Sequence, residues 1–401
     1  MILNTKNRCF SKLGLGLFVH YGLYSIIEKG EWIKVEDEIS DEEYDKLILQ
    51  FNPRKDFSDE ICGFAKQNGF KYIVFTARHH DGFSLYDTRG LSEYDSYNTI
   101  GRDLVKELVN SCRKYNIKFF LYHTLIDWHE EKKYDKFSNY LNYLYKSIDI
   151  LCTYYGDIDG FWFDGMWKYP NNDWNEEKLY KIVSKKQPNA IIVNNSGLDN
   201  IGKRISKYTD VVTCEQNSIK GYNYERNIDD YAFEMCQTLN DHWGYSREDI
   251  NYKSINEIIH NFCICRKYGG NYLLNIGLTS SGEIRSIERE LIDLFGEWIK
   301  VNSEAIYDTE PYDMALPSNT FALKKDGIIY FFIFNVPTKF NQNNKYIKIY
   351  LRNKDVENAF WLDNMEKICI DEDNTFLVNP FEYGVSFCVR IAKCIMRDKK
   401  Y

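Results

Sequence analysis

The sequence lacks long apolar runs and an excess of positive charge. No stretch of its 401 residues reaches the length of a membrane-spanning helix, and the first ten residues, MILNTKNRCF, contain no apolar core of the length found in secretory signals. The formal net charge of −8 is spread along the chain, which argues against nucleic acid or an anionic membrane as the main partner. We therefore expect a cytoplasmic protein with a neutral or polar small-molecule substrate.

Motifs of cofactor and nucleophile chemistry are missing as well. No G-x-G-x-x-G or P-loop motif follows an expected strand, so we expect no nucleotide cofactor. The G-x-S-x-G elbow of many serine hydrolases is also missing. The close cysteine pair, Cys263 and Cys265, has no second pair or histidine cluster at zinc spacing, and we interpret it as core packing.

Eight short β-branched or aromatic runs alternate with helical patterns between about residues 13 and 300. This alternation is typical of βα units on a parallel sheet, and eight strands predict a closed barrel. The expected strands are 15–21, 71–79, 118–124, 160–165, 190–196, 210–216, 242–245 and 271–277, with the weakest pattern at 242–245.

The pattern changes near residue 308. Short alternating runs with turn residues between them follow, which predicts an antiparallel β-sandwich. We therefore expect an α/β fold with a (β/α)8-like catalytic barrel over residues 1–307 and a C-terminal antiparallel β-sandwich domain over residues 308–401.

Polar side chains gather at the carboxyl ends of the expected strands, where a βα barrel has its active site; we call this end the mouth. In GFWFDGMW, residues 160–167, side chains alternate, so Trp162 and Asp164 point to one side while Phe161 and Phe163 face the helices. We expect Asp164 to lie in the mouth. The alternative interpretation is an aspartate that caps the following loop.

A glycosidase needs two carboxyl groups, one to attack or stabilise the anomeric carbon and one to protonate the departing oxygen. Glu215 is the natural partner of Asp164, because it ends the sixth strand and the barrel brings that end back across the mouth from the fourth. Glu31 and Glu234 are its competitors. Glu234 lies in DDYAFEMCQTL, whose spacing fits either a helix or an extended run.

The remaining candidates suit a sugar, which offers hydroxyls for hydrogen bonds and one apolar face for stacking. The candidates for hydroxyl binding are His20, His79, His80, Tyr122 and His123, and those for stacking are Trp32, Trp162 and Trp243. A metal site is the rival interpretation of the histidines. Because His79 and His80 are adjacent, on a strand they would point to opposite faces and could not share one ion without a bulge. We therefore expect no metal.

Seven motifs of this chain form an ordered set between about residues 10 and 310. They are GLGLFVHYGLYS, GEW, KYIVFTARHHDGFSLYDT, GRDLVKELVNSCRKYNIKFFLYHTLIDWH, GFWFDG, WGY and GGNYLLNIGLTSSGEI. In this order they resemble the α-L-fucosidases of glycoside hydrolase family 29. The resemblance implies a retaining exo-hydrolase that removes a terminal α-L-fucosyl unit through a covalent fucosyl-enzyme, without a metal or cofactor.

The same resemblance assigns roles to individual residues. It places the nucleophile at Asp164, and Glu215 is expected as the acid/base with Glu234 in reserve. It places fucose-binding positions at His20, Glu31, Trp32, His79, His80, Tyr122 and Trp162, with His123 beside them. Some members of the family have an arginine just after the fifth strand, where this chain has Ser196, so affinity or linkage preference is expected to differ. The segment from Gln216 to Tyr231 has no clear family match and is expected to shape what lies beyond the fucose.

Two other functional classes stay open. One is a fucose-binding barrel with an inactive site, against which the intact Asp164 and Glu215 speak. The other is a barrel hydrolase that acts on another glycoside or uses a metal. The sequence leaves open the fucosyl linkage and the number of subunits, a homo-oligomer included. Our prediction is a retaining α-L-fucosidase whose substrate is a fucosylated oligosaccharide or glycoconjugate.

Overall fold

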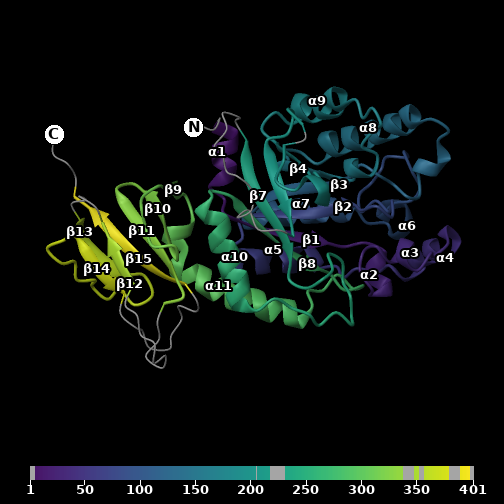
Figure 1. The fold of residues 1–401 in the computed structure, drawn as a ribbon. Coiled ribbons are helices and arrows are strands. Elements are labelled where there is room, and N and C mark those ends of the chain that lie inside the picture. The colour runs from purple at the N-terminus through teal and green to yellow at the C-terminus, as the bar shows by residue number, and fades with distance from the viewer. Residues whose placement is uncertain are drawn as a thin grey trace.

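The computed structural model of the chain combines a parallel barrel with two smaller antiparallel sheets (Figure 1). The structure describes residues 5–204, 206–216, 231–336, 347–351, 356–378 and 389–397. Within them, eight strands close in the order β1 to β8, and β8 pairs in parallel with β1. The predicted fold class is confirmed.

Each barrel strand is a short run whose alternate side chains face the interior and the surrounding helices. The strands are β1 (Leu15–His20), β2 (Tyr72–Arg78), β3 (Lys118–Thr124), β4 (Gly160–Asp164), β5 (Ile191–Asn194), β6 (Val211–Glu215), β7 (Ala232–Thr238) and β8 (Asn271–Gly277). Seven of them coincide with predicted strands.

The seventh strand is a correction, since it lies at 232–238 and not at 242–245. Ala232 and Cys236 belong to the interior cluster and Met235 to the outer one, so the alternation of a strand is present. Glu234 lies on the interior face and hid this pattern, because a buried glutamate is rare. Residues 242–245 belong to the loop that follows β7.

Amphipathic helices surround the barrel and pack apolar residues against its outer face. The longer ones are α5 (Phe57–Gln67), α7 (Leu104–Tyr115), α8 (Phe137–Tyr154), α9 (Glu176–Lys186), α10 (Ile255–Lys267) and α11 (Ser286–Ile306). In α7, the buried Leu104, Leu108 and Cys112 recur about one turn apart, and the Asp103 side chain caps the first turn by accepting from the backbone N of Lys106. Sequence spacing therefore sets both the face that is buried and where the helix starts.

Shorter helices lie in the loops and before the barrel. They are α1 (Thr5–Ser11), α2 (Tyr24–Ile27), α3 (Ile33–Glu36), α4 (Asp41–Asp45) and α6 (Ser96–Ile100), with 3-10 turns η1 (Lys46–Gln50), η2 (Glu131–Lys133), η3 (Met166–Lys168) and η4 (Leu198–Asn200). Between β5 and β6 the described residues form η4 but no α-helix, which is why the barrel is (β/α)8-like.

The interior of the barrel is packed with aromatic rings. Tyr72 and Phe120 lie at the amino ends of their strands, in the places where Gly16 and Gly160 have no side chain. Helix α1 covers this end: Phe10 is buried against both rings, and the Asn271 side chain donates to its backbone oxygen. The amino end of the barrel is thus filled by side chains, which leaves the mouth as the end available to a ligand.

The C-terminal part is built from two antiparallel sheets. Its strands are β9 (Glu310–Tyr312), β10 (Thr320–Lys325), β11 (Ile328–Phe334), β12 (Ile347–Tyr350), β13 (Val356–Trp361), β14 (Thr375–Val378) and β15 (Val389–Met396). One face of the five-stranded sheet β13-β15-β11-β10-β9 packs on the barrel, where the rings of Phe334 and His260 are 5.0 Å apart. Its other face packs Phe331 against Phe376 of the sheet β12-β14.

The junction between the two parts lies close to the predicted one. Helix α11 ends at Ile306 and β9 begins at Glu310. That residues 1–307 and 308–401 are separate domains stays a prediction.

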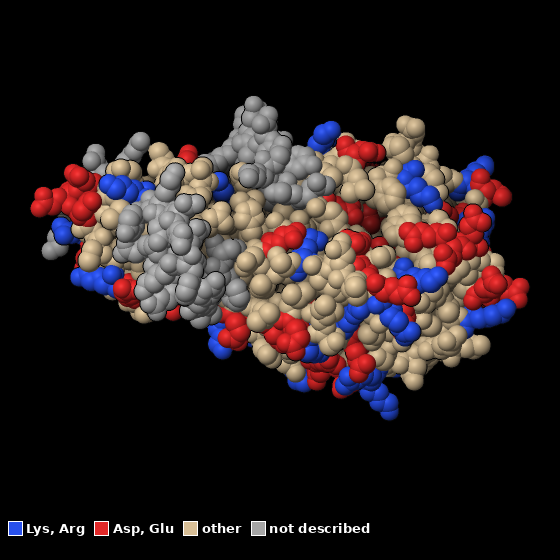
Figure 2. All heavy atoms as spheres, turned by 60° about the horizontal axis from the view of Figure 1, so that its bottom comes forward, with Lys and Arg blue, Asp and Glu red and all other residues tan. Residues whose placement is uncertain are grey.

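Three further features concern the helices, the surface charge and the close cysteine pair. Among the described residues, no helix has the length and apolar character needed to cross a bilayer. Over the described part of the face in Figure 2, acidic and basic side chains are interspersed. Cys263 and Cys265 are both buried in α10, as expected for core packing.

Candidate active site

The mouth of the barrel brings inward-facing side chains from the strand ends into one cluster. Strand β4 shows how the sequence arranges this. Trp162 belongs to the interior cluster, whereas Phe161 and Phe163 belong to the outer cluster under the helices. Asp164, two residues after Trp162, faces the mouth and is buried there, so the predicted orientation is confirmed.

One oxygen of Asp164 is surrounded by N–H donors. Its Oδ1 accepts hydrogen bonds from the backbone N of Gly165 at 2.8 Å, from Nε1 of Trp167 at 2.8 Å and from Nδ2 of Asn195 at 3.1 Å. Gly165 and Trp167 follow the end of β4, and Asn195 follows the end of β5. They fix the orientation of the carboxylate before any ligand binds.

The other oxygen, Oδ2, accepts from the Tyr122 hydroxyl at 2.9 Å and lies 3.5 Å from His80 Nε2. Burial by itself raises the pKa of Asp164, but hydrogen bonding and charge at His80, with the bonds from Trp167 and Tyr122, bring that pKa below its ordinary value. Asp164 is therefore ionised at neutral pH.

Glu215 ends β6 and faces Asp164 across one shared amide. Asn195 Nδ2 donates to Asp164 Oδ1 at 3.1 Å and to Glu215 Oε2 at 2.8 Å. The two oxygens are therefore separated by at most 5.9 Å, the length of these two bonds placed end to end. Burial and the negative charge of Asp164 raise the pKa of Glu215 to about 7, against hydrogen bonds from Asn195 and Trp243 that lower it. The mouth thus holds one ionised and one partly protonated carboxyl group.

Glu234 lies deeper in the barrel than Glu215. In the β6–β7 register, Thr213 pairs with Glu234 and Glu215 with Cys236, so Glu234 is two residues closer to the amino end. Its Oε1 accepts from Trp162 Nε1 at 2.8 Å and its Oε2 from the Tyr72 hydroxyl at 2.7 Å. Burial raises its pKa to about 7, against these bonds. Both oxygens are thus used in the layer beneath the mouth.

Three predicted histidines line the mouth. His20 Nδ1 is 2.6 Å from Asn275 Oδ1, and His80 Nδ1 is 2.6 Å from Thr124 Oγ1. The His79 ring packs 5.6 Å from the His20 ring, with an angle of 67° between the two ring planes. Burial lowers the pKa of His20 to about 3 and places that of His79 well below its usual range. Both rings are therefore neutral at physiological pH.

The prediction that His79 and His80 point to opposite faces of a strand is wrong. Strand β2 ends at Arg78, after a register shift between Thr76 and Arg78, so the two histidines lie beyond the strand and both rings reach the mouth. Strand alternation does not apply to them. In the described part of the chain, no three His, Cys, Asp or Glu side chains are grouped to hold a metal ion.

His123 is a correction as well, because it faces away from the mouth. Tyr122 and Thr124 point inward on β3, so the side chain between them points outward. His123 Nε2 lies 2.8 Å from the Ser147 hydroxyl on α8. It is a buried contact between β3 and a covering helix and does not reach the mouth.

Glu31 joins two of the quoted motifs, GEW and WGY. Its Oε2 accepts from the backbone N of Trp243 at 3.1 Å and of Gly244 at 2.7 Å. The Trp243 ring is 5.3 Å from the His20 ring, and the Trp32 ring is 5.4 Å from the His80 ring. Burial raises the pKa of Glu31. The structure therefore brings Glu31, Trp32 and Trp243 to the rim of the mouth, as predicted.

Comparison with known proteins agrees with this geometry. A family model described as alpha-L-fucosidase matches residues 3–304. The chain belongs to the α-L-fucosidase family. Tissue α-L-fucosidase of Rattus norvegicus is 30% identical over 356 residues, which cover 80% of this chain and 75% of that protein. Plasma α-L-fucosidase of Homo sapiens is 28% identical over 367 residues, which cover 82% and 76%.

Two solved structures in this α-L-fucosidase family extend the likeness to the whole fold. Isoenzyme 1 from Paenibacillus thiaminolyticus is 27% identical with a TM-score of 0.84, over 98% of this chain and 99% of that one. A fucosidase from Bacteroides thetaiotaomicron, described as a trapped covalent intermediate with 2-fluoro-fucosyl fluoride, is 22% identical with a TM-score of 0.82, over 98% and 95%. At 22% identity, the second structure shows only that the fold is shared.

Three residues at the mouth were not among the predicted site residues. Asn195, which directly follows the end of β5, bridges the two carboxyl groups. Trp167 donates to Asp164 from η3, three residues after it in DGMW. Trp128 packs its ring 5.6 Å from the His80 ring, from the LIDWH segment that follows β3. A tryptophan close behind a strand end was the signal available for the last two.

The structure describes Ser196, which stands where some family members have an arginine, but only part of the segment from Gln216 to Tyr231. The Ser196 hydroxyl donates to the backbone oxygen of Asn200 at 2.7 Å, which ties the loop after β5. An effect on affinity or linkage stays a prediction. Of the unmatched segment, residues 217–230 lie outside the described part of the chain.

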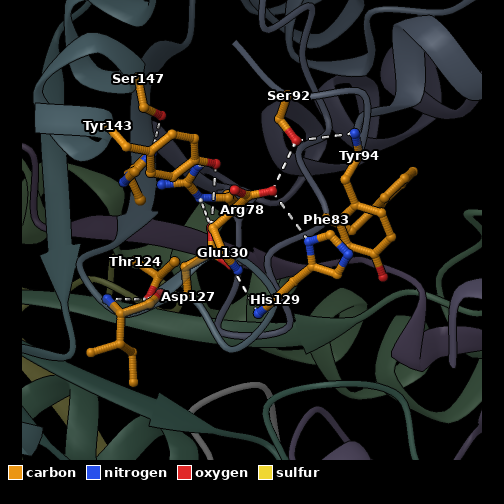
Figure 3. A network of polar contacts seen from close by, with 12 residues as sticks. Arg78, Phe83, Ser92, Tyr94, Thr124, Asp127, His129, Glu130, Tyr143 and Ser147 are labelled. Atoms are coloured by element: carbon orange, nitrogen blue, oxygen red, sulfur yellow. Dashed lines mark hydrogen bonds and ion pairs between the residues drawn. The ribbon is translucent and has the colours of Figure 1, made fainter. Parts of the chain in front are cut away.

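A buried polar network supports the loops next to the histidines (Figure 3). Arg78 Nη1 donates to the Tyr143 hydroxyl at 2.7 Å, and Arg78 Nε lies 3.5 Å from Asp127 Oδ2. Asp127 Oδ1 accepts from the backbone N of Glu130 at 2.8 Å, which fixes the turn after β3. From that turn the backbone N of Trp128 donates to His80 O at 2.9 Å. The network thus holds the segment that carries His80.

Proposed function

We propose that the chain is a retaining exo-α-L-fucosidase with Asp164 as nucleophile and Glu215 as acid/base. The observation that carries this proposal is the separation of at most 5.9 Å between Asp164 Oδ1 and Glu215 Oε2. Retaining glycosidases hold their two carboxyl groups about 5–5.5 Å apart, whereas inverting ones need roughly 6.5–9.5 Å to admit a water. A pair of carboxyl oxygens held by one amide favours the closer arrangement. The covalent intermediate described for the Bacteroides thetaiotaomicron relative supports the same mechanism.

The first chemical step uses the two carboxyl groups in opposite protonation states. Asp164 attacks the anomeric carbon while Glu215 gives its proton to the departing glycosidic oxygen, so the C–O bond to the leaving group breaks as the ester bond forms. The lowered pKa of Asp164 and the pKa of Glu215 near 7 suit these roles at neutral pH. The products of this step are the fucosyl ester and the free alcohol.

The second step reverses the role of Glu215. Esterification removes the negative charge of Asp164, which is one of the two main causes of the raised Glu215 pKa. The pKa of Glu215 therefore falls, and its carboxylate takes a proton from the incoming water. Water attacks the anomeric carbon, and the electron pair of the ester bond returns to Asp164. Two inversions give net retention.

Sugar recognition in this proposal rests on neutral imidazoles and aromatic faces. A neutral imidazole offers one donor and one acceptor, which suits a hydroxyl group that does the same. As neutral imidazoles, His20 and His79 would bind hydroxyls, with His80 and Glu31 beside them. Trp162 and Trp243 would pack on the apolar parts of the ring. Because aromatic side chains fill the barrel below Trp162 and Tyr122, the site is closed at its lower end, which favours exo action.

The substrate class follows from the family, and we propose a fucosylated oligosaccharide or glycoconjugate. The proposal needs no metal or cofactor, because general acid catalysis by Glu215 supplies what a Lewis acid would. A cytoplasmic location also stays a prediction.

Proton NMR of the first product tests the central claim. On an aryl α-L-fucoside we expect α-fucose to appear before mutarotation, and first-formed β-fucose would contradict retention. A panel of α1,2-, α1,3-, α1,4- and α1,6-linked fucosides then defines the linkage. Absence of turnover on every fucoside would favour the inactive sugar-binding barrel, and activity that is lost with a bound metal on EDTA treatment would favour a metal-dependent hydrolase.

A further inference from the structure

Trp167 lies three residues after Asp164 and donates its indole N–H to Asp164 Oδ1 at 2.8 Å. Resting on the proposed function, we propose that Trp167 is a positioning residue that stabilises Asp164 as it departs in the second step. Oδ1 takes three N–H donors, whereas the described donors to Oδ2 are one hydroxyl and the more distant His80. Trp167 therefore contributes one of three N–H donors on this oxygen.

The Trp167 indole is packed between two aromatic rings and the loop that carries Gly197. Its ring packs 6.1 Å from the His80 ring and 6.3 Å from the Trp32 ring. On the other side, Gly197 has φ +74°, and a Cβ added there would lie 2.8 Å from Trp167 Cβ. A residue with a side chain at position 197 would thus push the indole away from Asp164. The loops after β1, β2 and β5 thus surround the indole whose N–H reaches the nucleophile.

The two chemical steps depend on this N–H in opposite ways. In the first step Asp164 loses negative charge as its bond to the sugar forms, so the N–H stabilises the starting carboxylate most. In the second step the bond breaks and negative charge returns to Asp164, so the N–H stabilises the transition state more than the ester. Loss of the N–H should therefore slow the departure of Asp164 more than its attack.

Trp167→Phe removes the N–H and keeps an aromatic ring. The probe is 2-fluoro-fucosyl fluoride, with covalent labelling followed by intact-protein mass and the return of activity followed after the reagent is removed. We expect return about tenfold slower than in the wild type, the loss expected for part of a charged hydrogen bond, with labelling changed less than about threefold. The acidic limb of kcat/KM should move up by about one pH unit, because the carboxylate loses a donor.

Trp174→Phe is the matched control, since it makes the same change in the same β4–α9 connection. Its indole N–H donates to the backbone oxygen of Tyr169 at 3.1 Å and has no contact with Asp164. We expect this control to leave both rates and the pH profile within about twofold of the wild type. Gly197→Ala, which displaces the indole while retaining Trp167, should slow return in the same direction.

The outcomes separate this inference from the proposed function. A wild type that never forms the covalent adduct contradicts the retaining mechanism itself. If Trp167→Phe forms the adduct and its activity returns at the wild-type rate, the role of Trp167 alone is overturned. Equal slowing of labelling and return would also overturn it, because that pattern means a general loss of site structure.

Discussion

The mouth of the barrel and the layer beneath it each contain a glutamate with nearly the same raised pKa. Glu215 and Glu234 both have a pKa near 7, and burial is the main cause in each. Their surroundings differ. Glu215 faces a second carboxylate through Asn195, whereas Glu234 gives its two oxygens to Trp162 and Tyr72. A raised pKa therefore reports burial, and the position relative to the nucleophile decides which carboxyl group can take part in the reaction.

Removal of the nucleophile should have the largest effect on this comparison. We expect Asp164→Gly to lose at least about a thousandfold in kcat on an aryl fucoside, because the covalent step has no attacking group. Added azide should restore part of the rate by taking the place of the lost carboxylate. A variant that is folded by circular dichroism, unaffected by azide and near the wild-type rate would show that Asp164 is not the nucleophile.

Glu215→Gln and Glu234→Gln compare the two glutamates directly. For Glu215→Gln we expect a loss of about 100- to 10,000-fold in kcat/KM on natural fucosides, whose sugar leaving groups need a proton. On an aryl fucoside with an acidic phenol, formation of the covalent intermediate should change far less. Glu234→Gln should lower both activities by one common factor.

The opposite pattern would assign the acid/base to Glu234. Measurement of kcat/KM for one natural and one aryl substrate with each variant is sufficient, and the ratio of the two values is the informative quantity. Differences in folded fraction cancel in this ratio.

Glu234 should also affect stability in a defined pH window. Its pKa rises from 4.5 when unfolded to about 7 when folded, so its contribution is fully present below pH 4.5 and is lost as pH rises through 7. The free energy of unfolding of Glu234→Gln relative to the wild type should therefore rise by about 3 kcal/mol over this window, from 1.36 kcal/mol per pKa unit. Urea unfolding at several pH values measures it. A difference that does not vary with pH would show that Glu234 keeps an ordinary pKa.

The smallest effects should separate histidines inside and outside the mouth. Replacing His20, His79 or His80 by Ala should cost about 1–3 kcal/mol in transition-state binding, as for a lost buried hydrogen-bond partner. His123→Ala should change kcat/KM by less than about twofold and lower the melting temperature, since it loses its contact with Ser147. An equal loss of kcat/KM in His123→Ala would mean that it acts through β3 on the mouth.

Much of this molecule could be predicted because its barrel strands follow one local rule. Alternation on β4 placed Asp164 in the mouth from the sequence alone, and the position of Glu215 at the end of β6 followed in the same way. The rule failed where a strand had an unusual interior residue, as with Glu234 in β7. It also failed where the strand had already ended, as with His79 and His80, and where it was not applied, as with His123.

Other features depended on contacts between segments distant in sequence. Asn195 matters because β5 lies between the ends that carry Asp164 and Glu215, and its amide reaches both. Trp167 matters because the loop after β5 leaves it room at Gly197. No local pattern states either fact, since each requires the three-dimensional arrangement of the barrel.

Helix α1 imposes an order on assembly during synthesis. Its partners come much later in the chain: Lys6 pairs with Asp210 at 2.6 Å, and Phe10 O accepts from Asn271. At about 5–20 residues per second a ribosome needs on the order of tens of seconds to make the intervening chain. The backbone oxygen of Phe10 therefore spends that time without the Asn271 amide that finally donates to it. The segment made early is one of the last to be seated, and a chaperone that covers it would bridge this interval.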